Sequence, residues 1–246
     1  MPAFENGMAC GADGLEFDVR LSRDGVAVVI HDPTVERTTD GTGEVAALTA
    51  AELAALDAGS RFTCDGAFPF RGRGIGVPTL NDVLQGFPGV SLLVEMKLAS
   101  DELAAAVVKE IHAVDGLDRI SVGSFHQGAI EAVRRLEPKL RTGADTDEIK
   151  NEMTRGFFGQ PTTATRFHSF QVPELFTGIR IVTEDFVTRA HQAGVTVIVW
   201  TVDRAEDIIR LLDWGVDGII SDRPDVAVPT AHAWYAARQA CDRSAR

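Results

Sequence analysis

Two carboxylates, Glu16 and Asp18, stand two positions apart in an otherwise apolar run near the start of the chain. Alternate side chains of a strand point to the same face, so both carboxylates face one side while Leu15, Phe17 and Val19 face the other. Carboxylate oxygens on an apolar-backed surface suit a hard divalent cation such as Mg²⁺ or Ca²⁺. The pattern predicts a metal site on this strand, and a solvated acidic face is the ordinary alternative.

A histidine follows shortly after the two carboxylates. Only four residues reverse the chain before the next apolar run, which is too few for a parallel crossover. We therefore expect an antiparallel return strand, and a turn centred between Arg23 and Asp24 would place His31 opposite Glu16 on the same face. There, His31 would exchange a proton with an attacking water or a leaving alkoxide. A purely structural histidine held by Asp32 is the alternative.

A later apolar run ends in Glu95 and Lys97, which add a third carboxylate and an ammonium group. Together with Glu16 and Asp18, Glu95 would complete an oxygen donor set for Mg²⁺ or Ca²⁺, whereas zinc would call for more histidines. Lys97 would hold a phosphate oxygen as a point charge, so the groups fit phosphodiester hydrolysis. A structural ion pair between Glu95 and Lys97 is the alternative. Trp200 ends another apolar run and would line a substrate pocket or pack in the core.

The remaining chain alternates strands and helices, which is typical of a parallel α/β sheet. Besides the strand of Glu16 and one from residue 218, strands are expected at 90–97, 120–125, 140–145, 166–170 and 195–202. Helices are expected at 101–114, 127–136, 183–193 and 205–214. These seven parallel strands are one fewer than the eight of a closed (β/α)8 barrel, whose functional side chains gather at the strand carboxyl ends. We expect the first strand to lie upstream of Met1, with residues 2–10 forming the latter half of the helix that follows it.

The length and pattern indicate a single domain over residues 1–246. Residues 33–78 interrupt the alternation, and we interpret them as a small insertion beside the mouth of the barrel, with a solvated surface excursion without function as the alternative. Thr49 and Glu52 form a predicted capping box at the start of a helix inside this insertion. Residues 225–246 are expected to form a C-terminal helix or tail without chemistry.

The amino-acid composition of the chain limits which binding partners are expected. The chain has 24 basic and 36 acidic residues, a net charge of −12, which argues against nucleic acid and an anionic membrane surface as main partners. Its three scattered cysteines support neither a disulfide framework nor a thiolate zinc site. We find no signal-peptide pattern and no long apolar run, so we expect a cytoplasmic protein without stable membrane insertion, acting on a small molecule. The sequence leaves the oligomeric state open.

An ordered set of motifs across nearly the whole chain resembles the glycerophosphodiester phosphodiesterase family. The segments that carry the resemblance are Glu16-Phe17-Asp18-Val19, Val28-Val29-Ile30-His31-Asp32-Pro33, Arg37-Thr38-Thr39-Asp40-Gly41, Val77-Pro78-Thr79-Leu80, Val94-Glu95-Met96-Lys97, Trp200-Thr201-Val202 and Asp217-Gly218-Ile219-Ile220-Ser221-Asp222-Arg223-Pro224. The resemblance implies a TIM-type barrel that hydrolyses glycerophosphodiesters to glycerol 3-phosphate and an alcohol with a divalent cation. It implies Glu16, Asp18 and Glu95 as metal ligands, His31 as one of two catalytic histidines and Lys97 as a substrate contact.

The chain departs from the family at its start. The family opens with a strand ending in His-Arg-Gly, followed by Pro-Glu-Asn-Thr, and neither motif is present here. The first catalytic histidine and a phosphate-binding arginine are therefore missing from this sequence, either because it is truncated or because it is a shortened paralogue. Two alternative functions follow. One is a lysophospholipase D activity, favoured by Phe62, Phe68 and Phe70 in the insertion, and the other is an inactive barrel that binds a phosphorylated metabolite or a partner subunit.

Overall fold

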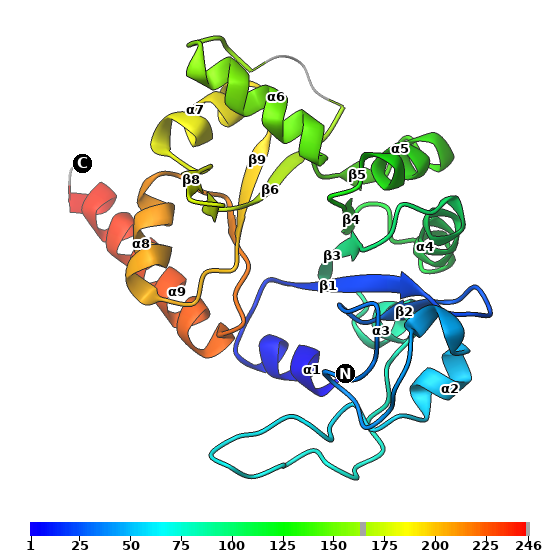
Figure 1. Ribbon diagram of the computed structural model, residues 1–246. Coiled ribbons are helices and arrows are strands. Elements are labelled where there is room, and N and C mark those ends of the chain that lie inside the picture. The colour runs from blue at the N-terminus through cyan, green and yellow to red at the C-terminus, as the bar shows by residue number, and fades with distance from the viewer. Residues whose placement is uncertain (163–165, 245–246) are drawn as a thin grey trace. The chain divides into compact units, whose positions relative to one another are not determined.

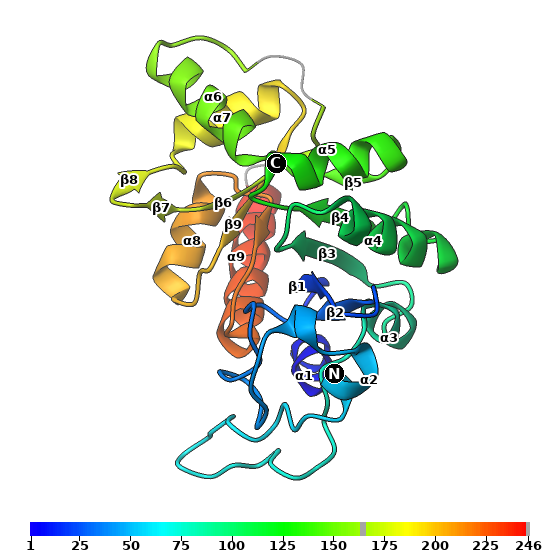
Figure 2. The same cartoon turned by 45° about the vertical axis from the view of Figure 1, so that its right-hand side comes forward.

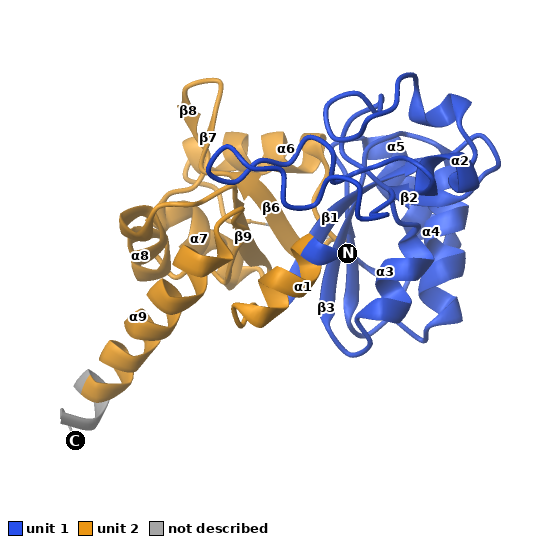
Figure 3. Ribbon diagram, turned by 90° about the horizontal axis from the view of Figure 1, so that it is seen from below, with its two compact units in different colours: residues 1–2, 14–141 blue, residues 3–13, 142–246 orange. Residues whose placement is uncertain are grey.

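The structure is a computed structural model that describes residues 1–162 and 166–244, the last four of these by their backbone alone. The described chain forms two compact units (Figure 3). The first comprises residues 1–2 and 14–141, and the second comprises residues 3–13 and 142–246. Each unit is described separately below.

The first unit is built on a five-stranded sheet with the order β2-β1-β3-β4-β5 (Figure 1). Strands β1, β3 and β4 run parallel, and the short strand β2 runs antiparallel to β1. Helices α4 and α5 pack side by side next to β3 and β4 (Figure 2). The elements are β1 (Gly14–Leu21), β2 (Ala27–Val29), α3 (Leu80–Gly86), β3 (Ser91–Met96), α4 (Asp101–Ala113), β4 (Ile120–Gly123), α5 (Gln127–Leu136) and β5 (Arg141–Thr142).

Side-chain alternation and helix capping account for these elements. Phe17 and Val19 of β1 are buried, and Glu16, Asp18 and Arg20 are only partly buried, as expected for a strand with one face on the core. Helix α4 begins at Ser100, whose hydroxyl accepts a hydrogen bond from the Leu103 backbone N–H at 3.1 Å. Its apolar stripe, which includes Leu103 and Ile111, is fully buried. This buried stripe packs α4 against the sheet that carries the side chains discussed below.

The segment 33–78 carries a small core of its own within the first unit. It contains η1 (Val45–Ala47) and α2 (Ala50–Ala54), and the predicted capping box of Thr49 and Glu52 at the start of α2 is confirmed. Apolar side chains of this segment pack with those of the return strand in one cluster that comprises Val28, Ile30, Val35, Val45, Leu53 and Val77. The segment is thus anchored directly to the residues that lead into His31.

The second unit contains a parallel sheet with the order β10-β9-β6. At its core, the Phe170 ring lies between those of Phe167 and Phe186, with centroid distances of 4.9 and 5.0 Å. A two-stranded hairpin, β7-β8, follows β6. The elements are α1 (Pro2–Ala9), α6 (Thr146–Phe157), β6 (Ser169–Pro173), β7 (Leu175–Phe176), β8 (Ile179–Arg180), α7 (Glu184–Gln192), β9 (Thr196–Trp200), α8 (Ala205–Asp213), β10 (Gly218–Ile219) and α9 (Pro224–Ser244).

The strand and helix predictions agree well with these elements. Each of the seven strands predicted as parallel has a counterpart among the described residues, and so do the four predicted helices and the terminal helices at either end. The sequence predictions did not include α3, α6 or the β7-β8 hairpin. No helix within residues 1–162 and 166–244 is long and apolar enough to cross a membrane.

Candidate active site

The parallel pairing of β1 with β3 brings the three predicted carboxylates together. Its register sets Asp18 beside Glu95, and Glu16 lies on the same face as Asp18 because two positions separate them. Glu16, Asp18 and Glu95 each offer one oxygen, and these oxygens all lie within 4.8 Å of one another. The three side chains are partly buried. The cluster therefore lies near the carboxyl ends of two adjacent parallel strands.

This donor set fits a hard divalent cation. Mg²⁺ and Ca²⁺ take carboxylate oxygens and complete their coordination with water and substrate, so three protein oxygens on one side leave room for a ligand on the other. Three carboxylates beside one ammonium group also leave a net negative charge, which a bound cation would offset. The geometry does not distinguish Mg²⁺ from Ca²⁺.

Lys97 lies directly against the cluster. Its Nζ is 2.9 Å from Asp18 Oδ1 and 2.6 Å from Glu95 Oε1, and the lysine side chain is only 16% exposed. Burial alone would lower the pKa of Lys97, but the hydrogen bonds to Glu95 and Asp18 outweigh it and raise the pKa above its ordinary value. The ammonium group therefore stays charged and is held at the carboxylates. The ion pair between Glu95 and Lys97 is present, as one interpretation of the sequence expected.

The predicted pairing of His31 with Glu16 is wrong. Strands β1 and β2 pair Val19 with Val29 and Leu21 with Ala27, which extrapolates to Phe17, not Glu16, opposite position 31. The turn contains three residues between Ser22 and Val26, whose backbones are hydrogen-bonded at 2.9 Å, and Gly25 supplies the left-handed conformation that such a turn requires. An odd number of turn residues shifts the register by one. Strand β2 ends at Val29, followed by one more backbone hydrogen bond from Ile30 N–H to the Asp18 carbonyl oxygen at 3.0 Å, so His31 lies beyond the end of the strand.

His31 is instead held by the residues around the end of β2. Its Nδ1 is 2.6 Å from Asp32 Oδ1, its carbonyl oxygen accepts a hydrogen bond from Arg20 Nε at 2.8 Å, and its side chain is 57% exposed. Asp32 in turn accepts two hydrogen bonds from the Arg37 guanidinium. These hydrogen bonds, from Arg37 first and His31 second, hold the pKa of Asp32 well below its usual range. The histidine is therefore solvent-accessible and oriented by an ionised carboxylate.

Arg20 was missed by the sequence predictions, although the alternation that selected Glu16 and Asp18 continues to it. Burial is the main cause of its lowered pKa, while attraction from Asp18, Asp32 and Glu95 acts in the opposite direction. The Arg20 guanidinium thus lies in the field of both the carboxylate cluster and Asp32. It links the two halves of the site electrostatically within the first unit.

Trp200 ends β9 in the second unit, where Pro173 is its partner in the parallel pairing of β6 with β9. Its side chain is partly buried. Its role as a substrate contact stays a prediction.

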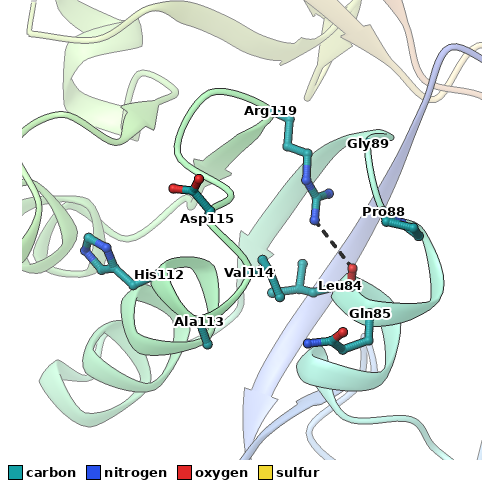
Figure 4. Close-up of a pocket in the computed structure, with 9 residues that line it drawn as sticks. All are labelled: Leu84, Gln85, Pro88, Gly89, His112, Ala113, Val114, Asp115 and Arg119. Atoms are coloured by element: carbon teal, nitrogen blue, oxygen red, sulfur yellow. Dashed lines mark hydrogen bonds between the residues drawn. The ribbon is translucent and has the colours of Figure 1, made fainter.

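A cavity of about 370 Å³ in the first unit lies away from these residues (Figure 4). It is lined by the turns that precede β3 and β4, so it opens at the amino ends of strands whose carboxyl ends carry the carboxylates. Arg119 at its edge donates hydrogen bonds to the carbonyls of Val90 at 3.0 Å and Leu84 at 3.4 Å. These bonds satisfy carbonyl groups around the end of α3, so we assign the arginine a structural role.

Comparison with known proteins agrees with this geometry. The chain matches the glycerophosphoryl diester phosphodiesterase family over residues 1–226. It belongs to this family. A glycerophosphodiester phosphodiesterase of Caldanaerobacter subterraneus subsp. tengcongensis is 32% identical over 92% of this chain and 88% of its own length. The family resemblance predicted from the motifs is therefore confirmed, and the family consists of phosphoric diester hydrolases.

Solved structures of the family share the fold. The glycerophosphodiester phosphodiesterase of Agrobacterium tumefaciens superposes with a TM-score of 0.71 and 26% identity, covering 92% of this chain and 91% of that one. An Oleispira antarctica phosphodiesterase, solved with its product sn-glycerol-3-phosphate, has a TM-score of 0.74 and 24% identity over 94% of this chain and 89% of its own. The predicted α/β fold of the TIM-barrel type is confirmed by these neighbours.

Proposed function

We propose that the chain hydrolyses glycerophosphodiesters to glycerol 3-phosphate and an alcohol, using a divalent cation held by Glu16, Asp18 and Glu95. The observation that carries this proposal is the convergence of three carboxylate oxygens within 4.8 Å, with the Lys97 ammonium beside two of the carboxylates. Family membership supports the reaction class, and the product named for the Oleispira antarctica phosphodiesterase is the one expected here. The substrate is a small molecule, and the cytoplasmic location expected from the sequence stays part of this proposal.

Each residue has a distinct part in the proposed reaction. A Mg²⁺ or Ca²⁺ ion, when bound, would polarise the phosphate and stabilise the charge that develops on it. Lys97 stays protonated against Asp18 and Glu95 and would contact a phosphate oxygen from that position. His31 would accept a proton from water or donate one to the leaving alcohol. Arg20 adds positive charge between His31 and the carboxylates.

The direct test is hydrolysis of glycerophosphocholine by the 246-residue chain and by a form extended with a strand that ends in His-Arg-Gly. We expect glycerol 3-phosphate and choline as products, with the extended form faster by up to ~10²–10⁴-fold, the usual contribution of general acid or base catalysis. Release of phosphocholine would contradict the proposed bond cleavage. Cation binding without turnover in both forms would favour the inactive phosphometabolite-binding barrel instead.

A lysophospholipid is the second candidate substrate, favoured by apolar side chains on the insertion. Phe62 and Phe68 are exposed, the Phe62 and Phe70 ring centroids lie 5.3 Å apart, and the Arg71 guanidinium carbon lies 3.5 Å from the Phe68 ring centroid. Aromatic rings with arginine favour lipid–water interfaces. If this substrate is the physiological one, the double variant Phe62→Ser, Phe68→Ser lowers turnover of lysophosphatidylcholine and leaves that of glycerophosphocholine unchanged.

A further inference from the structure

Three side chains, those of His31, Asp32 and Arg37, are joined by hydrogen bonds, and the His31 side chain is exposed. Asp32 Oδ1 lies 2.6 Å from His31 Nδ1, and the Arg37 guanidinium donates to both oxygens of Asp32, from Nη2 to Oδ1 at 3.0 Å and from Nε to Oδ2. Among the residues that the structure describes, His31 Nε2 has no hydrogen-bond partner. Nδ1 is thus held by Asp32, whereas Nε2 is left unbonded on an exposed side chain.

The backbone that carries Arg37 is firmly anchored. Val35 and Thr39, on either side of it, are fully buried, and the Thr39 hydroxyl and backbone N–H both donate to the Val35 carbonyl oxygen, at 2.8 and 3.0 Å. Val35 also belongs to the small apolar core that includes Ile30. The turn therefore holds the guanidinium in a fixed place relative to the segment that ends in His31 and Asp32.

We propose that Asp32 and Arg37 are positioning residues that set which nitrogen of His31 carries the proton. Asp32 accepts from Nδ1–H, so that the neutral ring keeps its lone pair on Nε2, the nitrogen that Asp32 leaves unbonded. Arg37 holds the carboxylate in the orientation that this bond requires. The inference rests on the proposed function only in giving His31 a proton to transfer.

Asp32 itself does not serve as the acid or base. The two hydrogen bonds from Arg37 occupy the carboxylate, and the pKa of Asp32 lies well below its usual range, so the group stays ionised in the working pH range. Charged groups near His31 include Asp32 at the ring, Arg37 beyond it, and Arg20, whose Nε donates to the His31 carbonyl oxygen. A carboxylate that stays ionised can orient the ring and stabilise its protonated form without moving a proton.

The decisive variant is Asp32→Asn, because it changes the tautomer and barely changes the shape. Oδ1 of Asp32 faces both His31 Nδ1 and Arg37 Nη2, and Oδ2 accepts from Arg37 Nε. An amide with its oxygen in the place of Oδ2 keeps the bond from Nε and turns its NH₂ toward Nδ1, which forces the proton onto Nε2. We expect kcat to fall at least about tenfold, and at most by the ~10²–10⁴-fold of general acid or base catalysis, with KM unchanged. The ¹⁵N chemical shifts of His31, assigned by comparison with His31→Gln, would show Nδ1–H in the parent and Nε2–H in the variant.

Arg37→Gln tests whether Arg37 orients the Asp32 carboxylate. Arg73→Gln is its control, since Arg73 is an exposed arginine of the same segment. Arg37→Gln should lower kcat by about tenfold or less and shift part of the His31 population to Nε2–H, with Arg37→Lys intermediate because lysine keeps the charge and loses the fork. Arg73→Gln should match the parent. An Arg37→Gln variant that matches its control would overturn the role of Arg37.

Asp32→Ala removes the acceptor of Nδ1 altogether, so retention of kcat and of the Nδ1–H tautomer in both Asp32→Asn and Asp32→Ala would overturn the whole proposal. The NMR measurement requires no turnover, so the proposed hydrolysis and the proposed positioning of His31 are tested separately. If the parent does not hydrolyse glycerophosphodiesters, the proposed function fails while the tautomer measurement still decides the positioning. Melting curves of each variant identify any loss of kcat that arises from unfolding.

Discussion

The carboxylate cluster and the His31 turn lie in the same unit of the molecule, but different features of the sequence fix them. Glu16, Asp18 and Glu95 are set by strand alternation and by the parallel register of two long strands. His31 lies beyond the end of a three-residue strand, and its position depends on turn length and on side-chain hydrogen bonds. The positions of side chains on paired strands, such as the carboxylate cluster, depend little on the length of a nearby turn. The position of a side chain in a loop, such as His31, changes with every residue added to the turn or removed from it.

The largest effect on hydrolysis should come from changing the carboxylate cluster on strands β1 and β3. Glu95→Gln removes one negative oxygen donor without changing the side-chain size, and we expect kcat/KM to fall by roughly 10²–10⁴-fold, corresponding to several kcal/mol of lost charge stabilisation. Glu102→Gln, at an exposed glutamate in the first turn of α4, should leave hydrolysis unchanged. A Glu95→Gln variant with parental activity would remove the cluster from the reaction.

Lys97→Met separates substrate contact from cation affinity within the cluster. Loss of the ammonium should lower kcat/KM, because a phosphate oxygen loses its partner, by about 10²-fold. The same change should strengthen cation binding by up to about tenfold, because one positive charge leaves the vicinity of Asp18 and Glu95. Isothermal titration with Mg²⁺ and Ca²⁺ measures the second effect, and weaker cation binding in the variant would contradict it.

The hydrogen-bonded turn of His31 and Asp32 should affect the pH dependence of the unfolding free energy. Because the pKa of folded Asp32 is depressed, its stabilising contribution is fully present above the unfolded pKa of ~3.9 and is lost as the pH falls toward the folded pKa. The difference in unfolding free energy between the parent and Asp32→Asn should therefore shrink between pH 5 and about pH 3. Urea unfolding at a series of pH values measures it, and a gap that widens with acid would have the wrong sign.

The smallest expected effect concerns the turn that sets the register. Gly25 has a φ of +77°, and a Cβ at this position would meet no other atom within 4 Å. Gly25→Ala should therefore cost about 1 kcal/mol of unfolding free energy through backbone strain alone. Gly128→Ala, in the first turn of α5 with an ordinary φ, should be neutral or slightly stabilising. Equal urea midpoints for the two variants would show that the turn is unstrained.

The strands and helices in which buried residues recur at a regular spacing could be predicted from the sequence. Alternation in β1 selected Glu16 and Asp18 and, carried two residues further, would have selected Arg20. The hairpin register was wrong because a three-residue turn containing Gly25 and a symmetric four-residue turn have nearly the same sequence pattern. The alternation of side chains between the two faces of a strand ends where β2 ends, so it could not predict the contacts of His31.

Two elements of the second unit were overlooked for a related reason. Helix α6 has a capping box formed by Asp145 and Glu148, but Glu152 is its only buried residue, so the apolar period is weak. The β7-β8 hairpin turns at Thr177 and Gly178, both with positive φ, and its strands are exposed. Capping and turn residues carried the signal in both places, and apolar periodicity did not.

Hydrolysis should depend on a divalent cation held by the cluster of Glu16, Asp18 and Glu95. The most direct measurement follows glycerol 3-phosphate release from glycerophosphocholine while Mg²⁺ or Ca²⁺ is titrated into metal-free protein, alongside calorimetric binding of the same ion. We expect no release without cation and half-maximal release at the calorimetric Kd. Release that persists in excess chelator, or that is indifferent to the bound ion, would contradict it.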